Sequence, residues 1–146
     1  MIALACDHGG FELMQEVKKY LDANNIAYAD FGTDSTESCD YPVFAIPAAR
    51  AVSRGECEKG IFICVTGLGM AMTANKIPGV RAAPCTDCFS AEMTRRHNNA
   101  NVLTLGARVI GSGLALKIVE VFLNTGFDGG RHSRRVDLIN SLDKPV

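Results

Sequence analysis

The chain has 146 residues, a length typical of one domain with a substantial hydrophobic core. Its 15 basic and 16 acidic residues nearly cancel to a formal charge of -1, which argues against a nucleic-acid-binding surface. The opening apolar run ends at Asp7, too early for a signal peptide, and no run of about 18 apolar residues predicts a membrane span. We therefore expect one cytoplasmic domain, residues 1–146, with neither nucleic acid nor membrane as a partner.

The first half of the chain alternates short apolar runs with segments of helical periodicity. Strands are predicted at residues 2–5, 27–31 and 60–64. The first helix follows the first strand and ends at Asn24, and its apolar positions recur at helical spacing: Leu13, Met14, Val17 and Leu21. An alanine-rich segment between Pro42 and Gly55 predicts the second helix.

The second half continues this alternation. A short helix is predicted at about residues 70–76, a fourth strand at 80–83, and then a helix capped by Thr86 or Asp87. A fifth strand at 102–105 precedes a helix at 112–124, and several glycines separate a short final helix, an arm, from the rest. The pattern predicts an α/β fold, a doubly wound, Rossmann-like three-layer sandwich with a central parallel sheet of about five strands.

Chemically capable residues lie next to the predicted strands, and ligands in such folds bind beyond the carboxyl ends of the strands. Asp7 and His8 follow the first strand, and Cys64 ends the third. A glycine-bearing turn into a helix follows Cys64, and its N–H groups and helix dipole favour a thiolate. His97 and Asn98 come just before the fifth strand. Cys64 is therefore a candidate base or nucleophile, the alternative being a buried, inert cysteine.

Several phosphate-binding motifs are absent or incomplete. A tyrosine-phosphatase loop requires an arginine at position 70, which is Met70, and a dinucleotide fingerprint requires a small residue where Met72 stands. Arg131 and Arg135 are four residues apart, so on a helix they share one face that could hold a phosphate or simply contact solvent. Arg108, just after the fifth strand, allows the same two interpretations.

The six cysteines are expected to be free thiols, because disulfide frameworks belong mainly to secreted chains. Cys85 and Cys88 form a CxxC pair that could be redox-active or half of a zinc site, but no second pair completes the zinc ligands. We expect neither a metal nor another cofactor.

Several motifs in order resemble those of type B ribose-5-phosphate isomerases, a family that also includes galactose-6-phosphate isomerase subunits. They are Cys-Asp-His-Gly-Gly at 6–10, Thr-Gly-Leu-Gly-Met at 66–70, Ala-Asn-Lys-Ile-Pro-Gly-Val-Arg-Ala-Ala at 74–83, Arg-His-Asn-Asn-Ala-Asn-Val-Leu at 96–103, Leu-Gly-Ala-Arg-Val at 105–109, and Gly-Gly-Arg-His-x-x-Arg at 129–135. The resemblance covers nearly the whole chain.

The resemblance implies a metal-free aldose-ketose isomerisation through a cis-enediolate, with Cys64 as the base and Thr66 assisting proton movement between the sugar oxygens. Backbone N–H groups from Gly67 through Gly69 to Met70 would stabilise the enediolate. Asp7 and His97 would open the sugar ring, and the remaining implied contacts to the phosphorylated sugar are His8, Tyr41, Asn98, Arg108, Arg131 and Arg135. The resemblance also implies sites shared between the subunits of a homodimer, which can pair into a tetramer.

One position departs from the family pattern, because Val65 stands where the family usually has glycine. If this position requires a positive φ, valine would be strained by about 1–2 kcal/mol. Three alternatives remain beside a ribose 5-phosphate isomerase: an isomerase of allose 6-phosphate or galactose 6-phosphate, a non-catalytic phosphosugar-binding module, and a thiol redox protein using Cys85 and Cys88.

Overall fold

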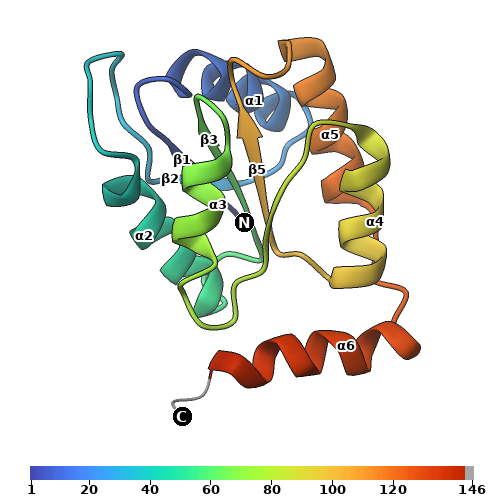
Figure 1. Cartoon of the computed structure of the whole chain (residues 1–146). Coiled ribbons are helices and arrows are strands. Elements are labelled where there is room, and N and C mark those ends of the chain that lie inside the picture. The colour runs from blue at the N-terminus through green and yellow to red at the C-terminus, as the bar shows by residue number, and fades with distance from the viewer. Residues whose placement is uncertain (144–146) are drawn as a thin grey trace.

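The computed structural model describes residues 1–143, so the predicted domain end at residue 146 lies outside the described part. A single parallel sheet stands between two layers of helices (Figure 1). The elements, in chain order, are β1 (Ile2–Cys6), α1 (Phe11–Ala23), β2 (Tyr28–Asp30), α2 (Tyr41–Ser53), β3 (Lys59–Cys64), α3 (Leu68–Ala74), β4 (Ala82–Pro84), α4 (Cys88–Asn98), β5 (Val102–Gly106), α5 (Ser112–Asn124), α6 (Arg131–Asn140) and the short 3-10 helix η1 (Ser141–Asp143). The predicted α/β sandwich with five parallel strands is confirmed.

Alternating side chains of the strands fill two separate cores. Ile2 and Leu4 of β1 face the core formed with α1, α4 and α5, whereas Ala3 and Ala5 face the core formed with α2 and α3. This period of two is the geometry of a strand buried on both faces. The four apolar residues predicted to form the buried face of the first helix are all buried in the first core: Leu13, Met14, Val17 and Leu21.

The strand order is β2-β1-β3-β5-β4. β2 therefore lies on one side of β1, and β3, β5 and β4 lie on the other. β1 and β3 are neighbours, with Cys6 paired with Ile63. Ligands of doubly wound sheets bind at this kind of topological switch point, beyond the carboxyl ends of the strands. The topology therefore brings the segments that follow Cys6 and Ile63 to one edge of the sheet.

Two predicted elements begin two residues away from their observed starts. Helix α3 begins at Leu68 rather than near residue 70, because Gly67 has a φ of 78° and turns the chain into the helix. β4 begins at Ala82 rather than at residue 80, since the N–H of Val80 still closes a turn by donating to the carbonyl of Ile77 at 3.1 Å. The cap of α4 is Asp87, whose carboxylate accepts the Ser90 N–H at 2.7 Å.

Helix α6 is an arm that crosses the end of the sandwich opposite the tip of the β5 arrow (Figure 1). Only His132 and Val136 of this helix are buried. Its far end is attached through η1, where the Asp143 carboxylate accepts the Gly79 N–H at 2.7 Å. Within residues 1–143, no helix combines the length and the apolar composition that crossing a bilayer requires.

Candidate active site

Cys64 lies at the end of β3, at the switch point, with a side chain that is only 5% exposed. Its Sγ accepts the backbone N–H of Gly67 at 3.1 Å. The first turn of α3 begins at the next residue, so the positive end of the helix also points toward this sulfur. A sulfur at the end of a strand with a backbone donor beside it is placed where a cysteine can act as a base or nucleophile.

The turn after Cys64 also offers donors for an oxyanion. Thr66 is exposed, and its Oγ1 accepts the Leu68 N–H at 3.3 Å. In the described part of the chain, the first-turn N–H groups of Gly69 and Met70 have no hydrogen-bond acceptor. The ring of Tyr41 covers Gly69 so closely that a Cβ there would lie 2.6 Å from a ring carbon. The turn therefore presents backbone donors beneath an aromatic ring.

Val65 is accommodated without backbone strain. The only non-glycine residues with positive φ in the described part are Asn25 and Asn99, so the strain considered for Val65 does not arise. Its side chain instead packs on Gly9, where an added Cβ would lie 2.4 Å from Val65 Cγ2. Its carbonyl accepts the Arg108 N–H at 3.1 Å and so joins the loop after β3 to the loop after β5.

Asp7 and His8 follow β1 at the same edge. Asp7 is buried, and its Oδ1 accepts the Gly10 N–H at 3.0 Å, which leaves Oδ2 for another partner. Nδ1 of His8 accepts the backbone N–H of Cys39 at 3.2 Å. An accepting Nδ1 places the proton of a neutral imidazole on Nε2, so His8 presents a donor to an anionic ligand.

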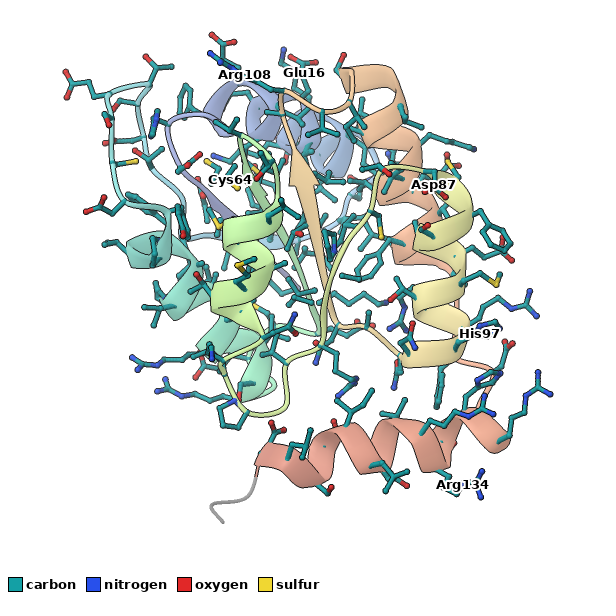
Figure 2. All side chains as sticks on the ribbon, viewed as in Figure 1. Glu16, Cys64, Asp87, His97, Arg108 and Arg134 are labelled. Atoms are coloured by element: carbon teal, nitrogen blue, oxygen red, sulfur yellow. The ribbon has the colours of Figure 1, made fainter. Side chains whose placement is uncertain are left out.

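A pocket of about 720 Å³ opens at this edge and is lined by His8, Val65 and Arg108, among others. Figure 2 shows Arg108 at the same end of the molecule as Cys64. Within residues 1–143, no carboxylate lies within salt-bridge distance of Arg108. An arginine without a carboxylate partner beside a histidine donor suits a phosphate group.

The other candidate residues lie at the opposite edge of the sheet. His97 and Asn98 form the last turn of α4, just before the amino end of β5, and Arg131 and Arg135 lie on α6. The five residues of β5 separate the two edges by about 15 Å, and Figure 2 shows His97 far from Cys64. Within one chain, the structure therefore divides the predicted site residues into two groups rather than bringing them together.

His97 has a neighbour that the sequence reasoning missed. The imidazole of His132 stacks on that of His97 with a centroid distance of 4.3 Å and an interplanar angle of 9°. Asp128 lies beside them, and ligand atoms of the three side chains all fall within 4.8 Å of one another. The one available signal was the position of His132, directly after Arg131 in a run predicted to bind phosphate.

The arrangement of these three side chains does not suit a metal ion. Zinc sits about 2.0–2.1 Å from imidazole nitrogens, in the plane of each ring. The lone pairs of parallel rings 4.3 Å apart run side by side and do not converge on one point. Asp128 is also engaged by Arg96, whose Nε donates to both carboxylate oxygens at 3.1 and 3.2 Å. The geometry is that of a stacked imidazole pair rather than of a metal centre.

Cys85 of the CxxC pair is not in the environment of a redox-active thiol. All six cysteines are free, and Cys85 is buried. Burial, with a smaller contribution from the Asp87 carboxylate, raises the pKa of Cys85 to about 11. A thiol that stays protonated at neutral pH is a poor nucleophile for disulfide exchange. The structure therefore disfavours the thiol redox alternative.

Comparisons with known proteins show the family to which the chain belongs. The family model for ribose/galactose isomerases matches residues 2–139. The ribose-5-phosphate isomerase B of Escherichia coli is 43% identical over 143 residues, which are 98% of this chain and 96% of that protein. The structure of the Clostridium thermocellum ribose-5-phosphate isomerase B superposes with a TM-score of 0.96 at 48% identity, covering 97% and 96% of the two chains.

A further solved structure carries a ligand. The ribose-5-phosphate isomerase B of Mycoplasma genitalium, with bound ribulose 5-phosphate, superposes with a TM-score of 0.95 at 38% identity, covering 99% of this chain and 97% of that one. The family match, the whole-length identities to several relatives and the superpositions agree with the observed fold. The chain belongs to the ribose/galactose isomerase family.

Proposed function

We propose that this protein interconverts ribose 5-phosphate and ribulose 5-phosphate, with Cys64 as the base that moves the proton. The bacterial relatives named as ribose-5-phosphate isomerases support the substrate, and the ribulose 5-phosphate complex of one of them supports the product. The observation that carries the catalytic role is the hydrogen bond from the Gly67 N–H to Cys64 Sγ at a helix N-terminus. The cytoplasmic location remains a prediction from the sequence.

The proton transfer follows from the loop. The Cys64 thiolate takes the proton from C2 of the opened aldose, and the electrons of the C–H bond form a C1–C2 double bond while O1 accepts the negative charge. The free N–H groups of Gly69 and Met70 stabilise this charge, since preorganised donors act most strongly where charge develops. Thr66 shifts a proton between O1 and O2, and Cys64 returns its proton to C1 to complete the ketose.

Phosphate binding and ring opening require residues from both edges of the sheet. His8 and Arg108 hold the phosphate from the Cys64 edge, and Arg131 and Arg135 approach it from the other edge. Ring opening uses Asp7 from the first edge and, from the second, His97, with Asn98 orienting the sugar hydroxyls. Because one chain keeps these groups about 15 Å apart, each site takes the second set from a neighbouring copy.

A homodimer is therefore the smallest assembly that completes a site, and two such dimers can form a tetramer. Exposed apolar side chains lie in both regions that must meet: Val109 is 51% exposed beside Arg108, and Leu138 of α6 is 64% exposed. Burial of these side chains between subunits would favour such an assembly.

The deciding experiment measures ketose formation and deuterium uptake from D₂O with ribose 5-phosphate, allose 6-phosphate and galactose 6-phosphate. We expect turnover of ribose 5-phosphate and a loss of about 10²- to 10⁴-fold in Cys64→Ala, the contribution typical of a general base. Cys88→Ala, at a half-buried cysteine that begins α4 after β4, two strands along the sheet from β3, is the matched control and should keep full activity. Binding of the substrate to Cys64→Ala should persist.

Other outcomes would redirect the assignment. The family description includes galactose isomerases, so turnover of a six-carbon sugar phosphate alone would keep the mechanism and change the substrate. Normal binding with no exchange in any sugar would contradict the isomerase and leave the phosphosugar-binding module. Full activity in Cys64→Ala would show that another group is the base.

A further inference from the structure

The stack between His97 and His132 is built by two elements far apart in the sequence. His97 lies in the last turn of α4 and is half-buried, whereas His132 is the second residue of α6 and is 9% exposed. The rings are nearly parallel at 4.3 Å, which is within the contact range of aromatic pairs. Nothing in the proposed isomerisation uses His132, although it touches a residue that the reaction requires.

The backbones that carry the two rings are tied together. The Asp128 N–H donates to the Arg96 carbonyl at 3.0 Å, and the Asp128 carboxylate accepts two bonds from the Arg96 guanidinium. Arg81 donates to the Asn98 carbonyl at 3.1 Å and to Asn140 Oδ1 at 2.9 Å, which joins the end of α4 to the end of α6. With both helices held at two points, the stack is a defined feature of the fold.

The charges around the pair favour a neutral His132. Burial lowers its pKa below the ordinary value of 6.5, and the charges of His97, Arg131 and Arg135 lower it further, against the smaller opposing effect of Asp128. A neutral ring can lie against His97 whether His97 is neutral or protonated, and against a protonated ring the contact is a favourable cation–π interaction. A neutral His132 can therefore stay stacked on His97 throughout the reaction.

Sugar ring opening requires a defined orientation of the His97 imidazole plane. The protonated imidazole gives its proton to the ring oxygen O4 as the C1–O4 bond breaks, and the C1 hydroxyl proton passes to the Asp7 carboxylate as the C1 carbonyl forms. A donor in this step must point at O4 within hydrogen-bond distance, and a small misorientation costs large factors in rate.

We propose that His132 is a positioning residue for His97: its stacked ring fixes the plane of the His97 imidazole so that a ring nitrogen is presented to the cyclic sugar. This inference rests on the proposed isomerase function and adds to it a residue that acts on ring opening alone. His132 does not touch the reacting atoms, and the proton transfer by Cys64 does not depend on it.

The test separates the cyclic from the open-chain substrate. Ribulose 5-phosphate has its C5 oxygen blocked by phosphate and cannot close a furanose ring, so its deuterium uptake at C1 in D₂O requires the Cys64 step and no ring opening. Turnover of ribose 5-phosphate, which is mainly cyclic, requires both. Each reaction is measured for the wild type, His132→Asn, which removes the flat ring, His132→Phe, which restores it, and Ser133→Ala as a control on the same helix.

We expect His132→Asn to lower kcat for ribose 5-phosphate by about 10- to 100-fold while changing deuterium uptake into ribulose 5-phosphate less than about twofold. His132→Phe should recover most of the loss, and Ser133→Ala should match the wild type. Equal losses in both reactions, with a raised KM, would show that His132 merely supports the phosphate-binding arginines of α6 and would overturn the proposal. A failure of His132→Phe to recover activity would also overturn it, since the ring nitrogens would then be essential.

The wild-type results distinguish a failure of this inference from a failure of the proposed function on which it rests. If the wild type neither forms ketose nor takes up deuterium, the proposed function itself fails. If the wild type is active in both reactions and EDTA has no effect, a loss confined to the cyclic substrate in His132→Asn can be assigned to the stack. Loss of wild-type activity on adding EDTA would instead indicate a metal held by the His97 group and would contradict the stacking role.

Discussion

Gly67 shows how strongly one position of the proposed catalytic loop is constrained. Its φ of 78° lies in the left-handed region, and a Cβ there would stand 2.9 Å from the Leu105 carbonyl carbon of β5. Its N–H is also the donor to Cys64 Sγ. The residue combines a turn, a close approach to the neighbouring strand and a contact with the proposed base, which only glycine permits together.

We predict that Gly67→Ala destabilises the fold by at least about 1–2 kcal/mol, because the left-handed conformation and the contact with β5 both oppose a methyl group. Gly113→Ala, on α5, is the matched control: a Cβ there meets nothing within 4 Å, so the change should be neutral or stabilising by up to about 1 kcal/mol. Chemical denaturation of both variants measures the difference. Equal stability of the two would show that the loop relaxes around the added methyl.

Val65 illustrates the limit of reasoning about a single position. Val65 would be strained only at a positive φ, and the φ of this residue cannot be predicted from its neighbours in the sequence. The structure shows that its φ is not positive. The loop accommodates valine because the missing Cβ of Gly9 leaves room for Val65 Cγ2. A glycine 56 residues away along the chain thus makes the substitution tolerable.

Helix α6 is the element whose attachment matters most for the candidate site. It buries only two side chains and is otherwise held by polar contacts, among them those of Arg81 and Asp143. Elements with few buried apolar contacts open at lower free energy than the core of a protein. The arm carries Arg131 and Arg135, so the proposed phosphate binding depends on its docking.

We predict that acid weakens the docking of α6. The pKa of His132 is lowered in the fold, first by burial and then by His97, Arg131 and Arg135, so below about pH 6.5 the undocked arm binds a proton that the docked arm does not. Stability from this group is therefore complete above pH 6.5 and is lost as the pH falls below it. The melting temperature of the wild type should fall more between pH 7.5 and 5.5 than that of His132→Phe, and equal falls would contradict the prediction.

The whole molecule holds the proposed site residues in two groups at opposite edges of one sheet, so the proposed shared site can be tested with mixed subunits. If each site combines Cys64 of one chain with His97 of another, a dimer of one Cys64→Ala and one His97→Ala chain contains one intact site and one doubly defective site. Neither variant alone contains an intact site.

We predict that mixing equal amounts of the inactive Cys64→Ala and His97→Ala proteins, with time for subunit exchange, restores about one quarter of the wild-type activity, since half of the dimers are mixed and each has one of two sites intact. Ketose formation before and after mixing measures this. A mixture of Cys64→Ala with Thr66→Ala, two changes on the same edge, is the control and should stay inactive. No recovery in the first mixture would contradict the shared site.

Much of the fold and half of the candidate site could be predicted from local patterns. A buried helix face is indicated by the spacing of Leu13, Met14, Val17 and Leu21, whatever that helix packs against. The predicted helix at 112–124 has the bounds observed for α5. Cys64 was identified because a strand end followed by glycines is a local feature. The motifs that resemble type B ribose-5-phosphate isomerases extended this assignment to the reaction.

Tertiary structure alone decided how the separated segments meet. Strand order placed Asp7 beside Cys64 and put His97 at the other edge, and the path of the chain after α5 laid His132 on His97 and Asp128 on Arg96. Periodicity and turn residues depend on neighbours a few positions away, whereas these contacts join residues about 30 or more positions apart and depend on the packing of the whole chain. Sequence therefore identified the chemical groups, and packing determined which of them share an edge.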